Sequence, residues 1–183
     1  MGEMPADDSL WVFGYGSLIW DPGFAYAERC RARLSGWRRS FCMHSIHYRG
    51  TVAAPGLVLA LDAEPDGVCE GVVYRVAPDR AAGVEAYLSD REMVSYAYNE
   101  ARLPVALEDG RRVMALTFVV NHDHSQYAGH LPPEEQARII AERAGERGPN
   151  ADYLFSTAAH LHALGIPDPD LDQLAERVRA LRE

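Results

Sequence analysis

The sequence predicts an α+β protein in which short strands come first and helices follow. Six short apolar segments, rich in β-branched and aromatic residues and bounded by Gly, Pro or Asp, indicate strands. One helical segment lies among them and three follow them, so strands and helices do not alternate as in a parallel α/β fold. No repeat, low-complexity run or change in composition divides the 183 residues. We therefore expect one domain over residues 1–183, with residues 1–9 flexible.

The first expected strand, Leu10-Trp11-Val12-Phe13, runs into a glycine-containing turn. Between the last two strands, Glu108-Asp109-Gly110-Arg111 is typical of a hairpin turn, so these strands should pair antiparallel. The expected strands after the first cover residues 38–45, 57–61, 71–76, 98–107 and 112–120.

Four helices are expected from their first residues and apolar faces. Pro78 begins one that continues to about Ser89, with Val84, Tyr87 and Leu88 on its apolar face. The pair Pro132-Pro133 begins a second. Asn150 is expected to cap a third, which Gly165 ends. The fourth carries an apolar stripe at three- and four-residue spacing: Leu171, Leu174, Val178 and Leu181.

Composition excludes several classes of function. The 27 acidic residues outnumber the 18 basic ones, for a net charge of −9, and no basic stripe is present, so no nucleic-acid partner is expected. All 18 basic residues are arginine, which excludes a Schiff-base lysine, a pyridoxal-phosphate lysine and a Walker A lysine.

The same composition bears on the compartment. The three cysteines lack C-x-x-C spacing and fit reduced, buried thiols. The acidic start resembles no secretory signal, and the longest apolar stretch, residues 51–61, contains Pro55 and is too short to span a membrane. We expect a cytoplasmic protein with no membrane partner.

The turn Gly14-Tyr15-Gly16-Ser17 follows a strand directly. A dinucleotide fingerprint would need a third glycine, and a nucleophile elbow would need glycines on both sides of Ser17, where Tyr15 and Ile19 stand. Two glycines can still turn backbone N–H groups inward to hold an anion such as a carboxylate. A tight turn without a ligand explains the same residues equally well.

The segment Leu88–Tyr96 places Asp90 and Glu92 just beyond the expected helix end, among Met93, Val94 and Tyr96. A carboxylate in apolar surroundings is poorly hydrated and can act as a base near neutral pH. The alternative, favoured by the segment alone, is a solvent-exposed Arg91–Glu92 pair.

Histidines give no recognisable metal site. His160 and His162 are two residues apart on a helix and do not share a face, and His122 and His124 lack a third ligand at a known spacing. The segment His44–Thr51 fits a ligand loop and a strand end followed by a turn equally well. We expect no metal and no cofactor.

Taken together, these segments resemble the ChaC-type γ-glutamylcyclotransferases, which act on glutathione. The resemblance covers Trp11 to about Leu181, and one difference is Ser95, where many relatives have glycine before the tyrosine. It depends on five segments in the same order: Val12–Trp20; Tyr48–Thr51 with Pro55–Leu57; Gly71–Arg75; Arg91–Met93; and Gly148–Phe155.

This resemblance implies a small, mixed, β-barrel-like sheet flanked by helices, without a cofactor. It implies that Glu92 is the catalytic base and that Tyr153 lies near the substrate. It also implies that one loop holds the γ-glutamyl group, comprising Tyr15, Gly16, Ser17, Leu18, Ile19 and Trp20.

The implied reaction is intramolecular: the α-amino group of the γ-glutamyl moiety attacks its own γ-carbonyl, giving 5-oxoproline and cysteinylglycine. Two alternatives remain at the level of sequence. One is a cyclotransferase for other γ-glutamyl amino acids or amines, and the other is a regulatory binding protein without catalysis.

Overall fold

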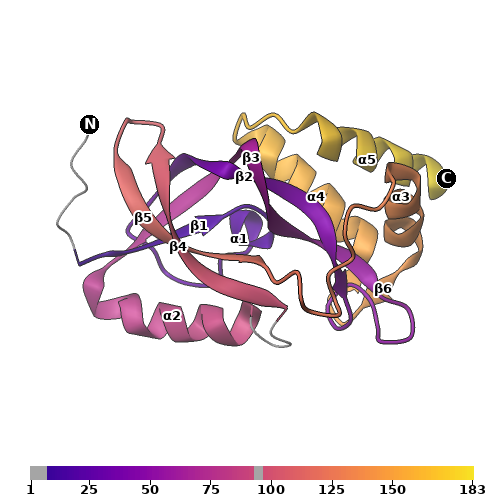
Figure 1. The fold of residues 1–183 in the computed structure, drawn as a ribbon, viewed down its shortest axis with the longest axis horizontal. Helices are drawn as coiled ribbons and strands as arrows, with labels where there is room; N and C mark the ends of the chain where they lie inside the picture. Colours follow the sequence, from indigo (N-terminus) through magenta and orange to yellow (C-terminus); the bar gives the residue numbers. More distant parts are fainter. Residues whose placement is uncertain (1–7, 93–96) are drawn as a thin grey trace. The chain divides into compact units, whose positions relative to one another are not determined.

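The chain divides into two units in the computed structural model, which describes residues 8–92 and 97–183 (Figure 1). The first unit comprises residues 1–39 and 61–121, and the second comprises residues 40–60 and 122–183. Residues 1–7, most of the segment expected to be flexible, lie outside the described residues. The expectation of one domain stays a prediction.

The first unit contains a closed barrel with strand order β1-β3-β2-β4-β5. β1 (Leu10–Gly14) pairs antiparallel with β3 (Gly56–Val76) and parallel with β5 (Arg112–Val120). β4 (Tyr98–Leu107) forms an antiparallel hairpin with β5 and also pairs with β2 (Glu28–Ser45). The parallel pairing of β1 with β5 closes the barrel, and β3 makes an additional parallel pairing with β5 at Leu61 and Val119. The α+β, barrel-like fold expected from the resemblance is confirmed.

Local patterns predicted β1, β4 and β5 closely, but β2 and β3 are longer than expected. β2 begins at Glu28, where arginines alternate with Ala32 and Leu34, which are buried. That period-two pattern was missed because the outward positions all carry arginine. The separate strands expected at residues 57–61 and 71–76 are two ends of the single strand β3, which continues through Pro65-Asp66-Gly67.

The barrel interior is apolar. Its buried side chains come from the strands of the first unit, because alternate residues of each strand point inward. Among them are Val12, Phe13, Leu34, Val73, Leu116 and Phe118, each no more than 2% exposed.

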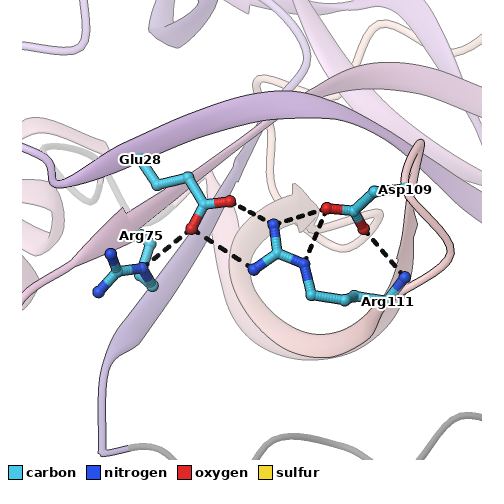
Figure 2. Close-up of polar contacts among 4 residues, drawn as sticks. All are labelled: Glu28, Arg75, Asp109 and Arg111. Atoms are coloured by element: carbon cyan, nitrogen blue, oxygen red, sulfur yellow. Dashed lines mark hydrogen bonds and ion pairs between the residues drawn. The ribbon is translucent and has the colours of Figure 1, made fainter.

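An ion-pair network joins three strand ends of the first unit (Figure 2). The Glu28 carboxylate, at the start of β2, accepts from Arg75 Nε at 3.0 Å and also pairs with Arg111. Arg111 Nε donates in turn to Asp109 at 2.9 Å, within the β4–β5 turn, where Gly110 has φ of 95°. The two arginines hold the pKa of the Glu28 carboxyl below its usual range.

Helix α2 (Pro78–Glu92) completes the first unit and ends three residues beyond the predicted end at Ser89. It buries Val84 and Leu88, as expected, and also Arg91. Tyr87, predicted on the apolar face, is 38% exposed, and its hydroxyl accepts from Arg91 Nη1 at 3.1 Å. Asp90 and Glu92 therefore lie in the last turn of α2 and not beyond it.

In the second unit, three helices pack against one another: α3 (Pro133–Glu142), α4 (Asn150–Ala163) and α5 (Pro169–Leu181) (Figure 1). The four predicted helices are thus confirmed. The short strands β6 (Ala144–Gly145) and β7 (Gly148–Pro149) pair with each other just before α4.

Two details of these helices differ from prediction. Asn150 is the first residue of α4 and not its cap, because its side chain accepts from Leu57 N and donates to Leu57 O, both at 2.8 Å. Leu181 is 57% exposed and so does not extend the buried stripe of α5.

Cys30, Cys42 and Cys69 are all free. Cys42 and Cys69 are buried as predicted, whereas Cys30 is only partly buried. No helix in the described parts of the chain is long and apolar enough to cross a membrane.

Candidate active site

The turn after β1 is a short helix, α1 (Ser17–Trp20), with Gly16 at its N-cap. The sequence did not predict this helix. Ile19 N donates to Gly16 O at 2.9 Å and Asp21 N to Ser17 O at 2.7 Å, which closes the turn. Among the residues that the structure describes, the amides of Gly16, Ser17 and Leu18 have no hydrogen-bond acceptor. The anion-cradle hypothesis requires donors without an internal acceptor, and it stays a prediction.

Long-range hydrogen bonds fix this turn to the barrel. The Tyr15 hydroxyl donates to Phe118 O at 2.9 Å, and Arg39 Nε donates to Tyr15 O at 2.7 Å. The Tyr74 hydroxyl donates to Leu18 O at 2.6 Å, and burial raises the pKa of Tyr74 to about 12, so this donor keeps its proton at neutral pH.

Side chains of the turn point mostly into the protein. Leu18 and Ile19 are 5% and 2% exposed, so both are packed in the interior. The Ser17 hydroxyl accepts from Arg91 Nη2 at 3.0 Å, and no histidine is its partner in the described part of the chain, so nothing activates Ser17 as a nucleophile there.

Arg91 connects this turn to the end of α2. Its guanidinium donates through Nη1 to Asp21 O at 2.6 Å and to Pro22 O at 3.1 Å, besides its bond to Ser17. Its Nε lies 3.4 Å from Glu92 Oε1. The structure therefore brings Ser17 and Glu92 to one guanidinium.

The Arg91–Glu92 pair is not the exposed surface pair that the segment alone favoured. The side chain of Arg91 is 6% exposed and that of Glu92 is 18% exposed. Glu92 and Arg91 therefore form a largely buried ion pair. The apolar neighbours expected for Glu92, namely Met93, Val94 and Tyr96, lie outside the described residues, as does Ser95.

Tyr153 belongs to the second unit. It lies in the first turns of α4 and is 7% exposed. Its hydroxyl accepts from Leu59 N at 3.2 Å, and its ring packs edge-on against Phe41. The role near the substrate that the resemblance implies for Tyr153 stays a prediction.

The histidines discussed above have structural partners. His124 Nδ1 accepts from Gln126 N at 3.1 Å, and His162 Nε2 lies 2.9 Å from Asp172 Oδ1. In residues 8–92 and 97–183, no group of three or more His, Cys, Asp or Glu side chains could hold a metal ion.

Arg91, Arg39 and Tyr74 are the residues that sequence reasoning missed in building this site. Arg91 was visible as the neighbour of Glu92, but its acceptors are mostly backbone carbonyls, which leave no signature in a sequence. The same holds for Arg39 and Tyr74.

A mixed barrel that carries a paired carboxylate beside a donor-lined turn defines a class of small enzymes that move protons on a polar ligand. Comparison with known proteins specifies the family. Residues 10–181 match the family model described as ChaC-like protein, and this chain belongs to that family.

Named relatives agree with this assignment. The glutathione-specific γ-glutamylcyclotransferase of Escherichia coli is 36% identical over 177 residues, which is 97% of this chain and 76% of that protein. The protein of the same name from Schizosaccharomyces pombe is 34% identical, covering 93% and 92% of the two chains. A crystal structure of a yeast γ-glutamylcyclotransferase specific to glutathione superposes with a TM-score of 0.88 at 27% identity, over 96% of this chain and 97% of the yeast chain.

Proposed function

We propose that this protein cyclises the γ-glutamyl group of glutathione, releasing 5-oxoproline and cysteinylglycine, with Glu92 as the general base. The names of its relatives in bacteria and yeasts support the reaction. The observation that supports the site is the Arg91 guanidinium, which contacts both the Glu92 carboxylate and Ser17 of the turn. In keeping with a glutathione-consuming reaction and reduced cysteines, we place the protein in the cytoplasm.

The nucleophile of this reaction is tethered to its target, so the protein must mainly hold the folded conformer and transfer protons. The α-amino group is mostly protonated at neutral pH and attacks only after losing a proton. Glu92 takes that proton as the new C–N bond of the lactam forms. The γ-amide C–N bond then breaks, and Glu92 returns the proton to the departing nitrogen of cysteinylglycine. Glu92 carries one of the two protons that the attacking nitrogen loses; the second leaves to water, and the released amine of cysteinylglycine takes one up from water, so no proton is consumed overall.

The turn after β1 supplies partial positive charge, through backbone N–H groups, for the negative groups of the substrate. The amides of Gly16, Ser17 and Leu18 are donors for the α-carboxylate of the γ-glutamyl group or for the oxyanion that develops on the γ-carbonyl. Tyr15, Ile19 and Trp20 shape the same turn. The assigned roles require no metal and no cofactor.

The decisive experiment is Glu92→Gln with glutathione as substrate and both products identified. The variant keeps the size of the side chain but removes the basic carboxylate, so kcat should fall by about two to four orders of magnitude with little change in KM. Asp90→Asn is the matched control, because Asp90 is exposed in the same helical turn and should matter little.

Circular dichroism and thermal melting must show that Glu92→Gln is folded, because it also breaks a largely buried ion pair. A folded variant that turns over glutathione near the parent rate would remove Glu92 from the mechanism. A parent protein that prefers γ-glutamylalanine would make it a cyclotransferase for other γ-glutamyl compounds, and one that releases no 5-oxoproline would make it a binding protein.

A further inference from the structure

Arg39 holds the peptide group that begins the turn after β1. It lies on β2 and is partly buried. Its Nε donates to Tyr15 O at 2.7 Å, and its Nη2 donates to Glu70 O on β3. All three residues belong to the first unit. The guanidinium thus ties the carbonyl of Tyr15 to two strands of the barrel.

Arg38, the preceding residue on β2, lies at the surface. Successive residues of a strand point to opposite faces of the sheet. The side chain of Arg38 is 45% exposed, and its Nη1 lies 3.8 Å from a carboxylate oxygen of Glu64. An exposed ion pair of this kind contributes little to stability. The two adjacent arginines of β2 therefore form a matched pair for experiment, one bound to the turn and one at the surface.

The carbonyl that Arg39 holds belongs to the same peptide group as the amide of Gly16. In a planar trans peptide the C=O and N–H bonds point in opposite directions, so a donor on Tyr15 O lies behind the Gly16 N–H and does not block it. Hydrogen bonds in a chain polarise one another, so a donor on the carbonyl makes the amide of the same group a stronger donor. A charged donor forms a stronger hydrogen bond than a neutral one, so its effect should be larger.

The other two amides of the turn have neutral donors behind them. Gly16 O, in the peptide group of the Ser17 amide, accepts from Ile19 N. Ser17 O, in the peptide group of the Leu18 amide, accepts from Asp21 N. Within residues 8–92 and 97–183, the Gly16 amide is therefore the one of these three whose peptide carbonyl accepts from a cation.

We propose that Arg39 is a positioning residue for the reaction. It acts through the Tyr15–Gly16 peptide and strengthens the Gly16 amide as a donor to a negatively charged oxygen of the substrate. This inference rests on the proposed function, in which the turn amides hold the α-carboxylate or the oxyanion that develops on the γ-carbonyl. Arg39 needs no contact with the substrate for this role.

Isotope labelling can observe this one peptide group directly. Tyr15-Gly16 is the only Tyr-Gly pair among the 183 residues. Protein made with tyrosine labelled at the carbonyl carbon and glycine labelled at nitrogen therefore gives a single carbonyl-correlated amide signal in NMR. We expect Arg39→Gln to move the Tyr15 carbonyl carbon and the Gly16 amide proton to higher field, because the charged donor is lost. Arg38→Gln should leave both in place.

An unchanged Tyr15–Gly16 signal in folded Arg39→Gln would overturn the proposal, because the guanidinium would then not act on this peptide. A measurement on the parent protein serves if that variant does not fold. With labelled arginine nitrogens, a scalar coupling should connect Arg39 Nε to the Tyr15 carbonyl carbon across the hydrogen bond. Its absence would also overturn the proposal.

Kinetics test the consequence for the reaction. Removing an oxyanion donor outright costs about a hundred- to a thousandfold in rate, so weakening one in Arg39→Gln should lower kcat/KM for glutathione by about tenfold. Arg39→Lys should restore part of this loss because it keeps the charge, and Arg38→Gln should match the parent. A fall in kcat at constant KM would assign the Gly16 amide to the oxyanion, and a rise in KM at constant kcat would assign it to the α-carboxylate.

Thermal melting is measured beside activity, because Arg39 also joins strands. A merely structural role would lower the Tm of both Arg39 variants and leave kcat/KM unchanged in protein that is folded at the assay temperature, and this result would overturn the proposal. A parent protein that does not turn over glutathione refutes the proposed function instead. The Tyr15–Gly16 signal would still decide whether Arg39 acts on this peptide.

Discussion

Replacing Arg91 should impair both stability and catalysis, because its side chain contacts both the turn after β1 and Glu92, the proposed base. In Arg91→Gln, the carbonyls of Asp21 and Pro22 and the hydroxyl of Ser17 lose a charged donor, and the Glu92 carboxylate loses its cation. Breaking a buried ion pair by removing one partner costs about 3–5 kcal/mol. With about 2–4 °C of Tm per kcal/mol for a protein of this size, the melting temperature should fall by on the order of 10 °C.

Arg91→Lys separates the catalytic consequence from the stability loss. It keeps the charge but cannot reach the same set of acceptors, so the base and the turn shift relative to each other. We expect kcat to fall by about ten- to a hundredfold in protein that is still folded at the assay temperature.

The assay follows 5-oxoproline release across pH, beside thermal melting of each variant. Arg102→Gln is the control: its ion pair with Glu85 of α2 is 52% and 42% exposed, so Tm and kcat should barely change. A folded Arg91→Lys protein with parental kcat would refute the reasoning, since Arg91 would then be structural only.

Three further predictions concern the turn, the ion-pair network and metals. Gly16→Val places a branched side chain where the substrate must approach free amides, so kcat/KM for glutathione should fall by at least about tenfold, with a smaller loss of stability. Gly16 has a φ of −137°, so the expected effect comes from blocked approach of the substrate and not from a positive φ. Glu28→Gln should lower Tm by about 2–4 °C at pH 7. The difference should shrink as the pH falls below the ordinary pKa of 4.5, because the Glu28 carboxyl has a lowered pKa in the folded state and its stabilisation is lost when it takes up a proton. Treatment with EDTA should leave glutathione turnover unchanged, since no metal-ligand group was found in the described residues.

Each of these has a clear contrary result. Full turnover and affinity in Gly16→Val would make the turn merely structural. A Tm difference for Glu28→Gln that persists at pH 3 would show that the charge of Glu28 is not its source. Activity lost with EDTA and restored by one divalent ion would require a metal in the mechanism.

Local patterns predicted most of the fold. Strands β1, β4 and β5 and all four long helices follow from period, turn residues and helix-start signals, because these depend on neighbours in the chain. Closure of the barrel did not follow from such patterns; it came from the resemblance. Strand β2 was predicted only in part, since its outward arginines concealed the alternation with Ala32 and Leu34.

In the candidate site, too, contacts between residues far apart in the chain were the part that the sequence did not predict. Glu92 and the turn were identified from the resemblance. The function of Arg91 depends on backbone carbonyls 69 and 70 positions away in the chain, and the residue types at those positions do not indicate such a contact. Asn150 was read as a helix cap from its residue type, whereas its amide pairs with Leu57, 93 positions away. Tertiary contacts of this kind override local preference.

The division of the chain into units has a consequence for synthesis on the ribosome. Strands β2 and β3 each begin in one unit and end in the other, so the chain passes between units at residues 39–40, 60–61 and 121–122. Every residue of the first unit has been made once residue 121 is added, and its barrel can then close. The hydrogen bonds from Leu57 N to Asn150 and from Leu59 N to Tyr153 form only after the C-terminal helices have been made. Residues 40–60 therefore take their final form last in the order of translation.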